Sequence, residues 1–171
     1  MAFTYKAIAT VTVGSGGASS IEFTSIAATY TDLCILLSAR SNRSAVSDPV
    51  NLEFNGSTTS DTSIYLEGDG SSASSGNAGG TQTEIARVPG ASATSSTFGN
   101  ALIYVPNYAG SQYKSSSGDS VTENNSTTAY AKLSAGLWSN TSAITSVKLI
   151  SQTGNSFVQH STATLYGIKN S

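Results

Sequence analysis

Apolar and polar residues alternate with a period of two along most of this chain, in short runs broken by turn residues. The clearest runs cover residues 5–13, 21–24, 50–54, 83–88, 129–138, 144–150 and 162–168. A period of two is typical of β-strands that bury one face. No window of a dozen residues keeps the i, i+3, i+4, i+7 spacing of an amphipathic helix. The pattern therefore predicts an all-β protein.

Four further runs complete the predicted strands. The segment Leu33–Leu37 is apolar at every position and predicts a central strand buried on both faces. Ile64–Leu66 and Ala101–Val105 are short apolar runs, whereas Tyr113–Ser117 is polar and predicts an edge strand. Asn55-Gly56, directly after the run 50–54, is a strong signal for a two-residue hairpin.

The strands are short and closely spaced, which favours one compact sandwich. Roughly nine to eleven strands, with turns about every 8–15 residues, indicate a sandwich or barrel. The Ser/Gly/Ala-rich stretch 71–80 has few side chains to bury and predicts a long, mobile surface loop. Alternation continues on both sides of it. We expect residues 1–171 to form a single antiparallel β-sandwich domain of jelly-roll type. One side of its core should consist of Phe23, Ile26, Leu33 and Ile35, and much of the other side of Leu137, Trp138, Ile144, Val147, Leu149, Leu165, Tyr166 and Ile168.

The composition and charge of the chain limit the kinds of partner that it is expected to bind. Charged residues make up 11% of the chain and the formal net charge is −2, while Ser and Thr supply about three residues in ten. The eight basic residues are scattered, so we expect no nucleic-acid binding. We also expect no membrane span and no secretory signal, because no long apolar stretch and no basic-then-apolar leader is visible. Little charge means little self-repulsion, which suits a subunit that packs against copies of itself.

Candidate nucleophiles lack the partners that catalysis needs. His160, the single histidine, lies in a polar turn-like stretch, and no G-x-S-x-G elbow is present. Cys34 lies between Leu33 and Ile35 in the most apolar strand, where a free cysteine acts as a small hydrophobic residue. We expect a solvated histidine and a core cysteine.

Acidic residues leave two chemical alternatives open. Glu53, Glu67, Asp69 and Glu84 could converge as the carboxylate pair of a glycosidase, which sequence spacing alone does not show. The loop 67–72 offers oxygen ligands on a Gly-hinged turn, as calcium sites do, but without EF-hand spacing. A Gly-Asp-Gly turn is more often only a turn. We therefore expect no catalytic residues, no metal site and no cofactor.

Several stretches resemble a group of short virion proteins, and C-terminal fibre domains, of tailed bacteriophages, cyanophages among them. The resemblance lies in strand and turn segments, not in site residues. These segments are Ile21–Ile26, Thr29–Leu33 and on through Arg40, Leu52–Gly56, Val88-Pro89 with Ala91–Thr94, Gly136–Ser139 and Ala163–Lys169. They cover most of the chain apart from 71–80 and 115–128.

The resemblance implies a structural role on a phage particle. The leading expectation is a capsid decoration (cement) protein on the outer head surface, made in the host cytoplasm, which binds the major capsid protein and copies of itself as a homotrimer. The alternative is a tail-fibre module that recognises host surface glycans. For that role Tyr104, Tyr108, Tyr113 and Tyr130, in or near turns, could stack on sugars.

Overall fold

The computed structural model describes residues 4–59, 61–77, 83–125 and 129–169 and forms twelve β-strands there, with no helix. The strands are β1 (Thr4–Thr12), β2 (Ser20–Phe23), β3 (Asp32–Ala39), β4 (Ser47–Phe54), β5 (Asp61–Gly68), β6 (Ala73–Asn77), β7 (Thr83–Pro89), β8 (Gly99–Val105), β9 (Lys114–Glu123), β10 (Ala129–Trp138), β11 (Val147–Ser151) and β12 (Thr162–Lys169). The prediction of an all-β chain is confirmed.

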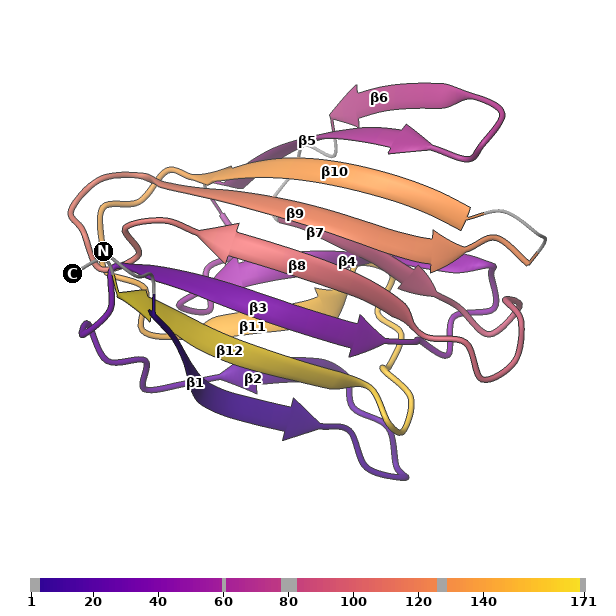
Figure 1. The fold of residues 1–171 in the computed structure, drawn as a ribbon, viewed down its shortest axis with the longest axis horizontal. Coiled ribbons are helices and arrows are strands. Elements are labelled where there is room, and N and C mark those ends of the chain that lie inside the picture. Colours follow the sequence, from indigo (N-terminus) through magenta and orange to yellow (C-terminus); the bar gives the residue numbers. More distant parts are fainter. Residues whose placement is uncertain (1–3, 60, 78–82, 126–128, 170–171) are drawn as a thin grey trace.

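Two antiparallel sheets pack face to face (Figure 1). The larger has eight strands in the order β1-β12-β3-β8-β9-β10-β5-β6, and the smaller has the order β2-β11-β4-β7. The part β1-β12-β3-β8 of the large sheet faces the small sheet β2-β11-β4-β7, with β8 against β7 and β1 against β2. This is the strand order of an eight-stranded jelly roll. The predicted antiparallel β-sandwich of jelly-roll type is therefore confirmed, and β9, β10, β5 and β6 extend the large sheet beyond β8.

The hydrophobic core lies between the small sheet and only one part of the large sheet, namely β12, β3 and β8. Inward side chains of these strands meet those of β2, β4 and β11. The buried set includes Ile21, Phe23, Leu33, Ile35, Leu37, Val50, Leu52, Phe54, Ile103, Val105, Val147, Leu149 and Leu165. The predicted core residues Phe23, Ile26, Leu33 and Ile35 are all buried.

The other part of the large sheet covers the edge of the small sheet. There β7 packs against β9, β10 and β5. Two N–H groups of this edge strand donate to serine hydroxyls of the large sheet, Glu84 N to Ser63 Oγ and Arg87 N to Ser120 Oγ, each at 3.2 Å. The approach is so close that a Cβ at Gly118 would lie 2.3 Å from the Ile85 carbonyl oxygen. Small and hydroxyl side chains are thus required on this inner surface.

That requirement explains why the prediction of an edge strand at Tyr113–Ser117 is wrong. From Lys114 the chain forms β9, which lies in the middle of the large sheet between β8 and β10. Its polar sequence reflects the backbone of β7 beneath it, and not an exposed sheet edge.

The predicted surface loop 71–80 is also partly wrong. Ala73–Asn77 forms β6, which pairs with β5 at the margin of the large sheet, and residues 78–80 lie outside the described part of the chain. Small residues fit this strand because the Tyr65 ring packs against it. A Cβ at Gly76 would lie 2.6 Å from the Tyr65 hydroxyl oxygen.

Asn55-Gly56 forms the expected tight turn but not a hairpin. Both residues have positive φ, and Ser57 N donates to Phe54 O at 2.9 Å. However, β4 belongs to the small sheet and β5 to the large one, so the turn carries the chain between layers. The Asn55 carboxamide oxygen accepts hydrogen bonds from Thr145 N and Ser146 N, which fixes the turn against the loop between β10 and β11.

Candidate interaction surface

The outer face of the large sheet exposes a group of large aliphatic side chains. Ile64, Leu66 and Leu133 are 60–62% exposed, and four others are 39–45% exposed. They come from five neighbouring strands, β3, β8, β9, β10 and β5. We call this group the apolar face: Leu36, Ile64, Leu66, Leu102, Val121, Leu133 and Leu137.

The register of the sheet aligns these side chains in rows. Leu66 pairs with Leu133, Leu133 with Asp119, Asp119 with Leu102, and Leu102 with Leu36. Directly paired residues in antiparallel strands point to the same side of the sheet. One row across five strands therefore presents four leucines with a single carboxylate at its centre.

Two predicted core positions belong to this surface. Leu137 was expected in the core and is 39% exposed, and Leu36, expected to be buried between layers, is 45% exposed. The sandwich has two layers, so each strand of the large sheet has one outward face. Alternation shows which residues share a face, but not which face points inward.

A groove crosses the apolar face beside β6. It has a volume of about 460 Å³, and its walls come from β6 and β10 while β5 forms its floor. The lining side chains include Ile64, Leu66, Ser75, Asn77, Leu133 and Ala135. The groove offers aliphatic contact and a few polar groups, and none of its lining side chains is charged.

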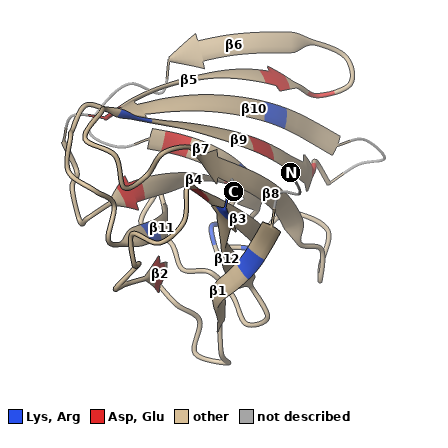
Figure 2. Cartoon of the chain, turned by 60° about the vertical axis from the view of Figure 1, so that its left-hand side comes forward, with Lys and Arg blue, Asp and Glu red and all other residues tan. Residues whose placement is uncertain are grey.

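Charged residues are sparse along the strands that carry this surface, as the coloured segments in Figure 2 show. On the five strands that carry the apolar face, Asp119 is the one outward charge in the central rows. Asp32 and Glu123 lie at the strand ends, where their carboxylates hold loops. Asp32 accepts from Tyr104 Oη and Asn107 N, each at 2.8 Å, and Glu123 accepts from Thr94 N at 2.6 Å.

A buried charge cluster lies on the opposite, inner side of the same strands. Lys132 on β10 forms an ion pair with Glu84, and its ammonium lies 4.0 Å from the centre of the Tyr65 ring. Arg87 pairs with Glu67 at 2.6 Å and approaches Glu84 at 4.0 Å. Burial lowers the pKa of Lys132, and the Glu84 carboxylate opposes that shift. The cluster fastens β7 to β5 and β10.

The structure brings two of the four candidate carboxylates together and separates the others. Glu67 and Glu84 share Arg87, as described above. Glu53 pairs instead with Lys148 at 3.0 Å, and Asp69 accepts hydrogen bonds from Ser71 and Ser72 in its own turn. The paired acids are thus joined to cations inside the sandwich.

The loop 67–72 does not gather its oxygen ligands. Glu67 reaches inward to Arg87, while both Asp69 oxygens accept hydrogen bonds from the loop, Oδ1 from Ser71 N at 2.9 Å and Oδ2 from Ser72 Oγ at 3.1 Å. These hydrogen bonds lower the Asp69 pKa. Within the described residues, no group of three or more His, Cys, Asp or Glu is placed to hold a metal ion.

Asp61 is an acid that sequence reasoning missed. It begins β5, pairs with Trp138 and is 3% exposed. Burial raises its pKa to about 6, the nearby Thr83 side chain opposes the shift, and the Glu53 charge adds to it. Nothing in the run Ser60–Ser63 marks Asp61 as buried, because its burial depends on β7 and β10, which are distant in sequence.

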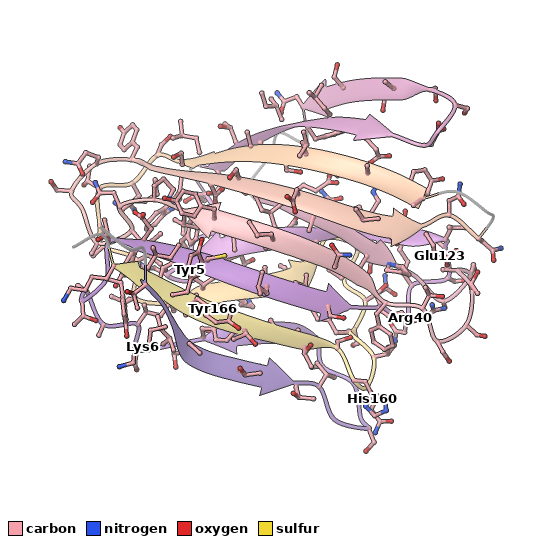
Figure 3. The ribbon with its side chains drawn as sticks, viewed as in Figure 1. Tyr5, Lys6, Arg40, Glu123, His160 and Tyr166 are labelled. Atoms are coloured by element: carbon pink, nitrogen blue, oxygen red, sulfur yellow. The ribbon has the colours of Figure 1, made fainter. Side chains whose placement is uncertain are left out.

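The remaining candidate nucleophiles are unsupported by neighbours. Cys34 is 3% exposed, and burial raises the pKa of its thiol, so it is less reactive than a free thiolate. His160 is exposed and lies at the end of the molecule near Arg40, as Figure 3 shows. The Arg40 guanidinium is occupied by carbonyls of the loop 91–97, including Thr94 O at 2.7 Å.

The four tyrosines considered for glycan stacking do not form a platform. Tyr108 is fully buried and donates to Ala27 O, and Tyr104 donates to Asp32. The Arg87 guanidinium lies 5.9 Å from the centre of the Tyr130 ring. Of the four, only Tyr113 is mostly exposed, at 59%.

The described part of the chain contains no helix long and apolar enough to cross a membrane. No family model, no curated protein and no solved structure matches this chain.

Proposed function

We propose that this chain is a non-enzymatic structural protein of a tailed-bacteriophage virion. Its role is that of a decoration protein on the outer head surface, where it binds the major capsid protein and copies of itself in a homotrimer. The observation that carries the proposal is the apolar face on a weakly charged jelly roll. The resemblance of the strand segments to phage virion proteins supports the placement on a particle.

The chemistry of the described residues favours assembly over catalysis. Glu53, Glu67 and Glu84 are joined to cations, and Asp69 is hydrogen-bonded within its turn. The groove beside β6 is apolar and holds none of these groups. A surface of aliphatic and hydroxyl side chains can be buried against neighbours without desolvating many charges, as subunit interfaces require.

A decoration protein also gains from repetition. A specific contact usually buries about 1,200–2,000 Å² in total, and weak contacts suffice when many identical copies bind a symmetric shell. A folded module of 17.4 kDa with little surface charge suits this arrangement. Glycan recognition by a tail fibre is the weaker alternative, because the four tyrosines do not converge.

The test is immunogold electron microscopy of virions from the phage that encodes this chain. An antibody raised against the purified chain is applied to intact and to disrupted particles, and particles grown without the gene serve as the control. We expect gold distributed over the heads of intact particles. Gold confined to the tail tip would overturn the decoration role in favour of receptor binding, and unlabelled intact and disrupted particles would overturn a virion role altogether.

A further inference from the structure

We infer that the apolar face is the surface through which copies of this chain associate with one another. The inference deepens the homo-oligomeric part of the proposed function by naming the interface. It concerns the purified chain in solution, so it can fail or succeed independently of any location on a virion.

The first argument is that the polarity of β5 and β10 is inverted. In β10 the outward positions are Ala, Ala, Leu, Ala and Leu from Ala129 to Leu137, while the inward positions include Lys132 and Ser134. In β5, Ile64 and Leu66 point outward, and Asp61 and Ser63 point inward. Antiparallel sheets with one solvated face normally place polar residues outward. The inward polar groups are explained by β7, whereas the outward leucines have no partner in the described part of this chain.

The second argument is size. Strands lie about 4.8 Å apart and alternate residues about 6.8 Å apart, so the apolar face spans on the order of 20 Å by 20 Å. The outer surface of all eight strands extends to roughly 34 Å across on the same spacing. A standard interface takes about 800 Å² from each partner. The sheet is therefore large enough to form one, with the aliphatic residues near its middle as an interface core requires.

The third argument is charge, which favours a second copy over a partner of opposite sign. The central rows carry Asp119 and no cation, so the surface neither selects a charged partner nor strongly repels itself. The net charge of the whole chain is only −2. A two-fold or three-fold arrangement can bring these rows together while keeping the Asp119 side chains of different copies apart, beside outward hydroxyls such as Ser115 and Ser117.

The fourth argument is shape. The face carries projecting leucines on β3, β8 and β10 and a hollow of about 460 Å³ between β6 and β10. A surface with both projections and a hollow can interdigitate with a copy of itself. Packed sheets lie about 10 Å apart with their side chains interleaved.

The experiment is analytical ultracentrifugation of the full purified chain from about 1 to 100 μM. We expect an assembly with a mass of at least two chains of 17.4 kDa. Leu133→Asp and Leu66→Asp each place a charge on the apolar face and should weaken association at least tenfold. Asp119→Asn removes the one central charge and should tighten association severalfold.

Controls separate loss of the interface from loss of folding. Gln159→Asp adds the same charge at an exposed position outside the apolar face and should associate like the unmodified chain. Leu133→Ser removes apolar surface without adding charge and should also weaken association. Circular dichroism and thermal unfolding should show that every variant is folded. A monomeric unmodified chain at 100 μM, or folded Leu133→Asp and Leu66→Asp variants that assemble normally, would overturn the inference.

Discussion

At the scale of single residues, Asp61 is an acid whose burial disfavours its charged form. It is enclosed by β7 and β10, and its pKa of about 6 lies above the ordinary value of 3.8. Between these two values the unfolded chain releases the proton while the folded protein retains it. Raising the pH through this range therefore favours the unfolded state, and the full penalty is present above about pH 6.

Replacing Asp61 with Asn should remove this pH dependence. The shift corresponds to up to about 3 kcal/mol at neutral pH. We expect Asp61→Asn to be more stable than the unmodified protein by about 1–3 kcal/mol at pH 7.5 and nearly equal to it at pH 4. Urea unfolding at the two pH values and at one protein concentration measures both differences. Equal stabilities at pH 7.5 would contradict the buried, proton-retaining state of Asp61.

Asp69 provides a control of opposite sign. Hydrogen bonds from Ser71 and Ser72 lower its pKa, so its stabilising effect is present above the ordinary aspartate pKa and is lost as the pH falls. Asp69→Asn should therefore be less stable than the unmodified protein at pH 7.5, and this difference should be smaller at pH 4. The effect at pH 7.5 is the reverse of that expected for Asp61→Asn. A change of the same sign in both variants would point to a general charge effect instead.

Residue-level predictions from sequence succeeded where local environment decides the outcome. Cys34 is buried as its flanking residues predicted, and Phe23 and Ile26 are in the core. Leu36 and Leu137 were wrongly expected to be buried. Alternation shows which residues of a strand share a face, but it does not show the direction in which that face points, toward the core or toward solvent. The partner strand that decides the direction, β7 in the case of β10, is about fifty residues away in sequence.

At the scale of elements, the β7 edge determines the composition of the strands that cover it. Gly118 on β9 and Gly136 on β10 leave room for Ile85 and Thr83, since a Cβ at either glycine would lie 2.3 Å from an atom of β7. An edge strand normally presents unpaired N–H groups to solvent. Here two of those N–H groups are bonded to serines of the opposite sheet.

Gly118→Ala should therefore destabilise the fold by overpacking. The added methyl group would press on the Ile85 carbonyl, which belongs to the backbone and cannot rotate away. We expect a loss of about 1–3 kcal/mol in the free energy of unfolding, measured by urea titration.

A matched control is Gly14→Ala, because a Cβ at Gly14 meets nothing within 4 Å and its φ is not positive. That variant should be neutral or more stable by up to about 1 kcal/mol. If Gly118→Ala and Gly14→Ala behave alike, the close approach of β7 to β9 is wrong.

Sequence patterns located most strands but not their neighbours. The run 129–138 matches β10 residue for residue, while β9 was mistaken for an edge and β6 for a loop. Both errors concern segments of small, polar residues. These segments form strands because of the backbone that lies next to them, β7 beneath β9 and β5 beside β6. Propensity and alternation carry no information about that backbone.

At the scale of the whole molecule, the topology pairs segments from opposite ends of the chain. Thr4 pairs with Lys169, so β1 and β12 close one margin of the large sheet. The two-layer architecture was predictable from strand number and spacing. The extension of the large sheet by β9, β10, β5 and β6 was not, and three of these strands, β9, β10 and β5, supply much of the apolar face.

Association through this face should respond weakly to salt. Ion pairs between copies contribute little to association because Asp119 is the one charge in the central rows. Salt screens any repulsion between the Asp119 carboxylates of different copies. We expect the association constant to change by less than about threefold between 50 and 500 mM NaCl, where screening lengths fall from roughly 14 to 4 Å. Sedimentation velocity over this range measures the change. Weakening by tenfold or more would require ion pairs between copies, which the apolar face does not offer, and the interface would then lie elsewhere on the molecule.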